Sequence, residues 1–107
     1  MNYEVRLTTE AENDLRGIFE YIAFELQSPQ NAAGQLDRLE QSIMSLDQMP
    51  ERFRVYEKEP WHSRDLRIMP VDNYLVFYIP NHEEQTVKIM RAIYGGRDID
   101  KQLNRFL

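Results

Sequence analysis

The sequence contains no cysteine and only two histidines, His62 and His82. A chain without cysteine cannot form a disulfide framework, a zinc ribbon or an iron–sulfur centre, and it has no thiol nucleophile. Two histidines among charged residues also give little basis for a metal site made of protein ligands alone. We therefore expect neither a metal nor a cofactor.

Long apolar runs are absent as well. No segment approaches the roughly 20 residues that a helix needs to cross a bilayer, and the first residues, MNYEVRLTTEAEN, lack the basic start and apolar centre of a signal peptide. Hydrophobic residues make up 42% of the chain and charged residues 29%, which is typical of a soluble globular protein. We expect one domain over residues 1–107, in the cytoplasm and without membrane association.

Positive charge is scarce, and it is unevenly distributed. The net charge of −5 argues against indiscriminate nucleic-acid binding, because contacts to phosphate need a basic surface. Residues 1–50 contain nine acids against three arginines, whereas residues 51–107 contain nine acids against ten bases. The second half of the chain can therefore present a local positive surface on an acidic body.

The first half of the sequence predicts a strand followed by two helices. Tyr3, Val5 and Leu7 alternate with polar residues, as in a half-buried strand. Thr9 and Glu12 match a capping box, and the residues that follow have apolar side chains at intervals of three and four up to Leu26. Ser28-Pro29 provides an N-cap and a first helical residue for a second helix, which Pro50 ends. So short a connection predicts an antiparallel helical hairpin.

The second half predicts three strands and a short helix. Residues 51–64 have no clear period and are expected to form a loop along the sheet edge, with Trp61 covering the core. Alternation resumes at 65–69, where Leu66 and Ile68 oppose Arg67 and Met69. The strand at 74–79 is apolar on both faces, which predicts a central position: Leu75, Phe77 and Ile79 on one face, and Tyr74, Val76 and Tyr78 on the other.

The last strand is predicted over 86–94 and ends at Gly95-Gly96. Alternation assigns Val87, Ile89, Arg91 and Ile93 to one face and Lys88, Met90, Ala92 and Tyr94 to the other. Asp98 can then cap a short helix with Ile99, Leu103 and Phe106 on one side. The predicted fold is α+β with two layers: the helical hairpin packs on one face of an antiparallel sheet. The other face, assigned to Arg67, Tyr74, Val76 and Tyr78, is expected to be partly open.

This order of elements, with LTTEAENDL entering the first helix and NYLVFY and TVKIMRAIYGGRD in the last two strands, resembles the RelE/ParE superfamily of toxins from type II toxin–antitoxin systems. The resemblance spans nearly the whole chain. It implies a small cytoplasmic toxin that arrests growth and forms a hetero-oligomer with a cognate antitoxin, whose extended and helical C-terminal part wraps it. It also implies one of two targets: ribosome-bound messenger RNA in the RelE branch, or DNA gyrase in the ParE branch.

The residues favour the ParE branch. Cleavage of RNA without a metal needs a group to activate the 2′-hydroxyl, a cation for the phosphate oxygens and an acid for the leaving oxygen. RelE-like enzymes take these from basic residues on the middle strands and a tyrosine or histidine near the C-terminus. This chain has Leu75 where that branch often has arginine, and residues 104–107 contain neither tyrosine nor histidine. The remaining nuclease candidates are Arg67, Arg91, Tyr94 and Arg97.

The ParE-branch pattern of a last strand followed by a glycine-containing corner corresponds to Arg91, Tyr94, Gly95, Gly96 and Arg97 here. The leading hypothesis is therefore a non-enzymatic toxin that binds gyrase, interferes with its cleavage cycle and is held inactive by an antitoxin. The alternatives are a metal-independent, ribosome-dependent endoribonuclease, and an inactive interaction module that binds partners through an open sheet face. The candidate partner-binding residues are Arg67, Tyr74, Tyr78, Arg91, Tyr94 and Arg97. For Arg91 an ion pair at the sheet margin is an equal alternative. Tyr94 can instead pack at the sheet edge, and Arg97 can be solvated.

Overall fold

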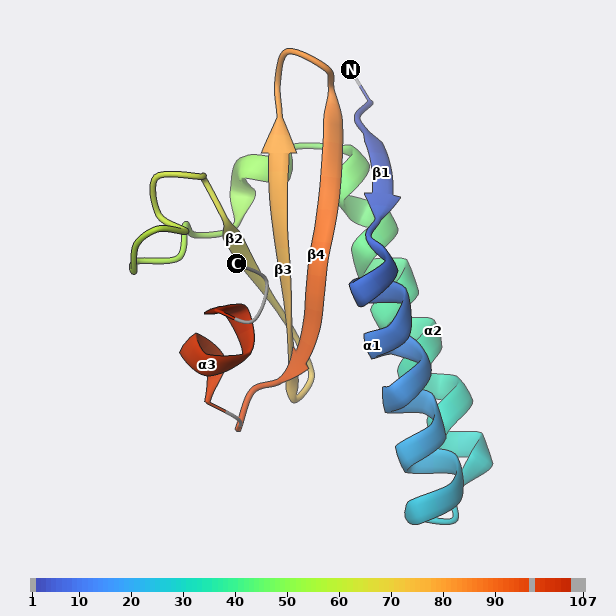
Figure 1. The fold of residues 1–107 in the computed structure, drawn as a ribbon. Helices are drawn as coiled ribbons and strands as arrows, with labels where there is room; N and C mark the ends of the chain where they lie inside the picture. The colour runs from blue at the N-terminus through green and yellow to red at the C-terminus, as the bar shows by residue number, and fades with distance from the viewer. Residues whose placement is uncertain (1, 97, 105–107) are drawn as a thin grey trace.

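The computed structural model describes residues 2–96 and 98–104 (Figure 1). The main elements are β1 (Glu4–Leu7), α1 (Thr9–Glu20), α2 (Pro29–Met44), β2 (Arg67–Val71), β3 (Tyr74–Asn81), β4 (Thr86–Tyr94) and α3 (Ile99–Asn104). The two long helices lie side by side along one side of the sheet, and α3 lies on the other side. The predicted α+β class and order of elements are confirmed.

Helix α1 begins one residue earlier than the capping box predicts. The N-cap is Thr8, whose hydroxyl accepts a hydrogen bond from the Ala11 amide at 3.0 Å. The same hydroxyl donates to the Met90 carbonyl at 3.0 Å, so it also fixes the helix to β4. Thr9, the predicted cap, is the exposed first residue of the helix.

The connection between the two helices is as short as predicted. After Glu20 the chain widens into a π-helical turn, η1 (Tyr21–Glu25), and Gln27 reverses direction with a φ of 53°. Pro29 opens α2, although the Ser28 side chain forms no cap hydrogen bond. The chain leaves α2 through two 3₁₀ turns, η2 (Ser45–Asp47) and η3 (Pro50–Arg52). The hairpin extends beyond the end of the sheet, as Figure 1 shows.

The four strands have the order β1-β4-β3-β2, and β3 is central, as its two apolar faces predict. The pairs β2–β3 and β3–β4 are antiparallel, but β1 runs parallel to β4. The expectation of a purely antiparallel sheet is therefore wrong at its first strand. Alternation fixes which residues share a face but not the direction in which a distant strand returns, so the sequence pattern could not reveal this pairing.

A bulge interrupts β4. Phe77 pairs with Arg91, whereas the next residue, Tyr78, pairs with Ile89, so Met90 has no partner on β3. This extra residue reverses the alternation of side chains along the strand. The face beneath the helices therefore receives Val87, Ile89 and Ala92, and the opposite face receives Met90 and Ile93. The faces predicted for β4 are correct up to Met90 and wrong beyond it for this reason.

The main core lies between the sheet and the helical hairpin. It is formed by buried side chains from both layers, among them Ala11, Leu15, Leu39, Ile43, Met69, Val76 and Tyr78. Tyr74 packs against the same cluster. The assignment of Tyr74, Val76 and Tyr78 to an open face is therefore wrong, because the helices cover the face that was expected to be free.

The opposite face has a second, smaller core. Its buried members are Tyr56, Trp61, Leu66, Ile68, Phe77, Ile93 and Leu103, so the segment before β2 and helix α3 cover this end of the sheet. The predicted role of Trp61 is confirmed, since only 4% of it is exposed. A third cluster of Ile22, Ala23 and Ala32 closes the projecting end of the hairpin. In the described ranges, no helix has the length and apolar character needed to cross a bilayer.

Candidate functional site

The corner after β4 is built on close packing. The Gly95 amide donates to the Asn73 carbonyl at 2.9 Å, which ties the corner to the β2–β3 turn. A Cβ on Gly95 would lie 3.3 Å from that carbonyl oxygen, and one on Gly96 would lie 2.6 Å from a carbon of the Tyr94 ring. A side chain at Gly95 would crowd backbone, and one at Gly96 would force the half-exposed Tyr94 ring to move; neither glycine has a positive φ. The predicted residue Arg97 lies outside the described residues, as does Phe106.

Tyr94 stands at this corner, half in solvent. Its ring is 49% exposed and meets Tyr74 edge-on, with ring centroids 5.8 Å apart. Burial raises the pKa of Tyr74, and the neighbouring phenols of Tyr94 and Tyr21 add to that rise. The ring contact between Tyr74 and Tyr94 lies at the end of β3 and β4. Tyr94 both packs at the edge and leaves half its surface accessible.

Arg91 is held by Asp14 of α1. Its Nε donates to one carboxylate oxygen at 2.6 Å and its Nη2 to the other at 2.9 Å, and both side chains are mostly buried. The Ala92 amide donates to the same carboxylate at 3.0 Å. The pairing of β1 with β4 ends at Leu7 and Ile89. Beyond that point the Asp14 carboxylate accepts the Ala92 amide hydrogen bond that a neighbouring strand would otherwise accept. Of the two roles considered for Arg91, the structure has the ion pair at the sheet margin.

Arg67 is engaged in a different region, at the start of β2. Its Nη1 donates to the carbonyls of Glu51 and Phe53, each at 2.8 Å, and its Nη2 pairs with Asp65 at 3.1 Å. The guanidinium therefore holds the irregular segment before β2 against the sheet. Its place on an open face, expected from the sequence, is wrong.

Tyr78 is fully buried under the helices. Its hydroxyl donates to the Pro50 carbonyl at 2.6 Å, and burial raises its pKa to about 12. A partner cannot reach this side chain in the folded chain. The predicted nuclease set is therefore dispersed: Arg67 and Arg91 serve separate parts of the fold, and Tyr94 stands at a third place.

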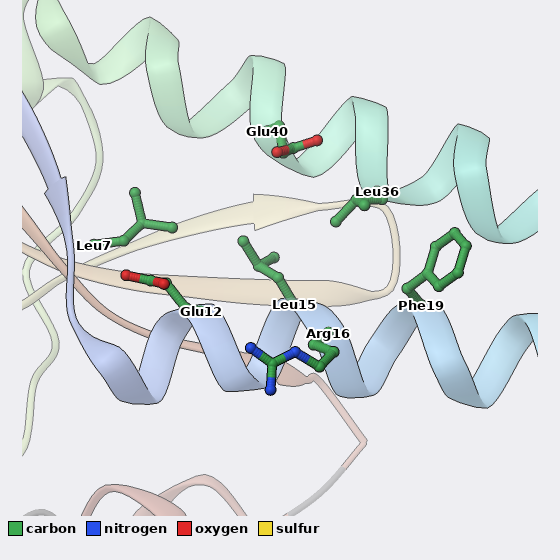
Figure 2. A pocket seen from close by; sticks show the side chains of 7 residues that line it. All are labelled: Leu7, Glu12, Leu15, Arg16, Phe19, Leu36 and Glu40. Carbon is green, nitrogen blue, oxygen red and sulfur yellow. The ribbon is translucent and has the colours of Figure 1, made fainter.

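A groove between the two helices was not predicted. It has a volume of about 400 Å³ and opens between α1, α2 and the end of β1 (Figure 2). Leu7, Leu15, Phe19 and Leu36 supply its apolar surface, and Glu12, Arg16 and Glu40 supply its charged groups. The sequence contained one signal for it. Phe19 and Leu36 belong to the apolar stripes of the two helices, and together they make those stripes wider than the sheet face that the helices cover.

Residues 5–99 match the family described as ParE toxin of type II toxin-antitoxin system, parDE. The chain belongs to this family. The resemblance to the RelE/ParE superfamily predicted from the sequence is thereby confirmed, and the match covers both long helices, β2, β3, β4 and all but the first residue of β1.

Solved structures share the fold of this ParE-family chain at low sequence identity. A chain of the chromosomal ParDE system from P. aeruginosa superposes with a TM-score of 0.70 at 16% identity, covering 86% of this chain and 95% of that one. The toxin–antitoxin complex RelBE2 from Mycobacterium tuberculosis gives 0.62 at 23% identity, with 88% and 99% covered. The archaeal RelE–RelB complex from Pyrococcus horikoshii gives 0.61 at 22%, with 92% and 100% covered. No curated protein matches the sequence.

Proposed function

We propose that this ParE-family toxin is not an enzyme and that it acts in the cytoplasm by binding DNA gyrase and arresting growth. The observation that carries the proposal is the engagement of both candidate arginines described here. Arg91 is paired with Asp14, and Arg67 is bound to two carbonyls and Asp65. A phosphoryl-transfer site needs cations aimed at one point where a phosphate can sit. These two guanidinium groups are aimed into the fold.

The surface proposed to meet gyrase is the corner around Tyr94. Half of the Tyr94 ring is accessible, and the Asn73–Gly95 hydrogen bond and the Tyr74 ring hold it in place. Rigid, half-exposed aromatic side chains are frequent among residues that dominate binding energy at protein interfaces. This corner therefore combines an anchor side chain with a fixed backbone.

Purified toxin in gyrase supercoiling and cleavage-complex assays tests this proposal. We expect inhibited supercoiling by the wild-type chain and weaker inhibition by Tyr94→Ala. Phe24→Ala is the matched control, because Phe24 is an aromatic residue that is 68% exposed at the far end of the hairpin. Unchanged gyrase activity together with codon-specific cleavage of messenger RNA on ribosomes would reverse the proposal in favour of the endoribonuclease.

The proposal also includes an antitoxin, which we place in the groove between α1 and α2. Related structures contain toxin–antitoxin complexes. The groove has an apolar surface from Leu7, Leu15, Phe19 and Leu36. Two of its three charged lining residues are the acids Glu12 and Glu40, the third is Arg16, and the helices that frame it are mainly acidic. An amphipathic helix that combines an apolar stripe with basic side chains matches this surface. The expected assembly is a hetero-oligomer of toxin and antitoxin.

Binding of the protein encoded by the neighbouring reading frame tests this part. We expect Leu36→Arg to weaken the complex strongly, because it places a charge inside the groove. Asn31→Arg introduces the same charge at an exposed position of α2 outside the lining and should leave the affinity unchanged. Equal loss for the two variants would place the antitoxin elsewhere. Unhindered growth on expression of the folded toxin alone would instead favour an inactive interaction module.

A further inference from the structure

A second hollow lies on the outer face of the sheet, at the end that α3 and the segment before β2 leave uncovered. It has a volume of about 280 Å³, and its lining includes Arg6, Ile79, Glu84, Thr86, Lys88 and Met90. The strand register explains the arrangement. Arg6 of β1 pairs with Lys88 of β4, and Lys88 pairs with Ile79 of β3, so these side chains form one row across three strands. Their neighbours Val5 and Val87 pack on the helix face, which places this row on the outer face.

Two polar side chains of this hollow, Lys88 and Thr86, have no hydrogen-bond or ion-pair partner among the described residues. Lys88 is exposed and forms no hydrogen bond or ion pair with any described residue. Thr86 is only 8% exposed, and its hydroxyl likewise has no partner among the described residues. Arg6 pairs with Glu4 at 2.9 Å, but both side chains are more than half exposed, and such pairs contribute little. A donor hydroxyl and two cations thus face the same space.

The chemistry of the lining selects the ligand. Two cations directly opposite each other on neighbouring strands repel, and an anion between them removes that cost. Glu4 pairs with Arg6, and Glu84 also lies within electrostatic range of Arg6. Lys88 is the cation of the row that has no anion among the described residues. Ile79 and Met90 add apolar surface beside the cations. The best match is a carboxylate next to an aliphatic side chain, whereas Glu4 and Glu84 oppose a polyanion such as nucleic acid.

We propose that this hollow binds an acidic, apolar segment of a partner protein. One carboxylate of the segment lies between Arg6 and Lys88 and accepts from the Thr86 hydroxyl, and a neighbouring aliphatic side chain packs on Ile79 and Met90. This surface is separate from the groove between the helices and from the Tyr94 corner. The inference therefore does not depend on the proposed gyrase inhibition or on the placement of the antitoxin.

The experiment is a titration of the full-length ¹⁵N-labelled chain, followed by NMR, with the peptide acetyl-Leu-Glu-Ile-Asp-Leu-amide. We expect saturable shifts confined to the amides that surround the hollow. The same peptide with Gln and Asn in place of the acids should bind about tenfold more weakly, the loss typical of one charge-assisted hydrogen bond. Equal binding of the neutral peptide, or no saturable shifts, would overturn the proposal. Tighter binding of a thymidylate 12-mer at the same salt would assign the hollow to nucleic acid and also overturn it.

Variants localise the effect. Lys88→Met should weaken peptide binding by about tenfold on the same grounds, whereas Lys101→Met, which removes an exposed lysine from α3, should not. Lys88→Glu should reverse the preference, so that a peptide with Lys in place of the acids binds better than the acidic one. Arg6→Met is the second variant if a change at Lys88 disturbs the fold, which the dispersion of the free spectrum reports. Wild-type affinity in both Lys88→Met and Arg6→Met would refute the site.

Discussion

Replacing Asp14 tests whether one carboxylate holds the uncovered edge of β4. Asp14→Ala removes the acceptor of two guanidinium hydrogen bonds and of the Ala92 amide bond. Breaking a mostly buried ion pair costs about 3–5 kcal/mol. The side chains of Asp14 and Arg91 keep 15% and 16% of their surface in water, which favours the lower end. We expect a loss of about 3 kcal/mol, a large part of the 5–15 kcal/mol typical of a domain.

Urea unfolding monitored by circular dichroism measures this loss in the free energy of unfolding. In a thermal melt, the melting temperature should fall by about 10–20 °C. Asp37→Ala is the control, because Asp37 is exposed on α2 and has no bonded partner among the described residues. Asp14→Asn should lie between the wild type and Asp14→Ala, since the amide oxygen still accepts from the Ala92 amide. Adding Arg91→Met to Asp14→Ala should recover part of the stability, because it removes the mostly buried guanidinium charge. A loss below about 0.5 kcal/mol for Asp14→Ala would refute the reasoning, because that is the scatter of neutral surface changes.

Three further changes test other contacts. Thr8→Ala should destabilise the fold by about 1–2 kcal/mol in the same urea assay, since it removes a helix cap and a bond to β4, whereas Thr9→Ala should have little effect. Tyr78→Phe should cost about 1–2 kcal/mol by leaving a buried carbonyl without its donor, with the exposed Tyr21→Phe as a neutral comparison; equal values would contradict the buried bond. Hydrogen bonds from Lys58 and then Tyr56 lower the pKa of Asp100, so its ionised form stabilises the docking of α3. Amide protection in α3 should therefore be full above the ordinary carboxyl pKa and fall as the pH drops through the lowered one, and hydrogen exchange of Asp100→Asn should show no such dependence.

Much of the fold was predictable because local patterns agree with the final packing. The spacing of apolar residues in α1 and α2 follows the surface that packs on the sheet, and the two apolar faces of β3 identify a central strand. The two errors in the sheet concern distant partners. The direction of β1 depends on β4, and the faces of β4 depend on a single unpaired residue, Met90. Neither is encoded in the alternation of any one segment.

The candidate site was less predictable than the fold. Arg91 was identified as a charge that needs a partner, but the partner is Asp14 on a helix, 77 positions away. The spacing of apolar residues identifies an amphipathic helix, but it does not show which charged residue of that helix will form an ion pair. The groove between α1 and α2 is lined by residues of β1 and both helices, and the outer hollow by residues of β1, β3, β4 and the turn between β3 and β4. Such spaces follow from assembled elements and not from a motif.

The parallel pairing of β1 with β4 has a consequence for the synthesis of the protein. Glu4 pairs with Thr86 and Leu7 with Ile89, so the first strand cannot find its place until the last strand exists. A nascent chain that ends before β4 lacks Val87, Ile89 and Ala92, which pack against the apolar side of the helical hairpin in the main core. Contacts so far apart in the chain also slow folding relative to a purely helical domain. We therefore expect termination before β4 to yield fragments that proteases remove and not a smaller folded domain.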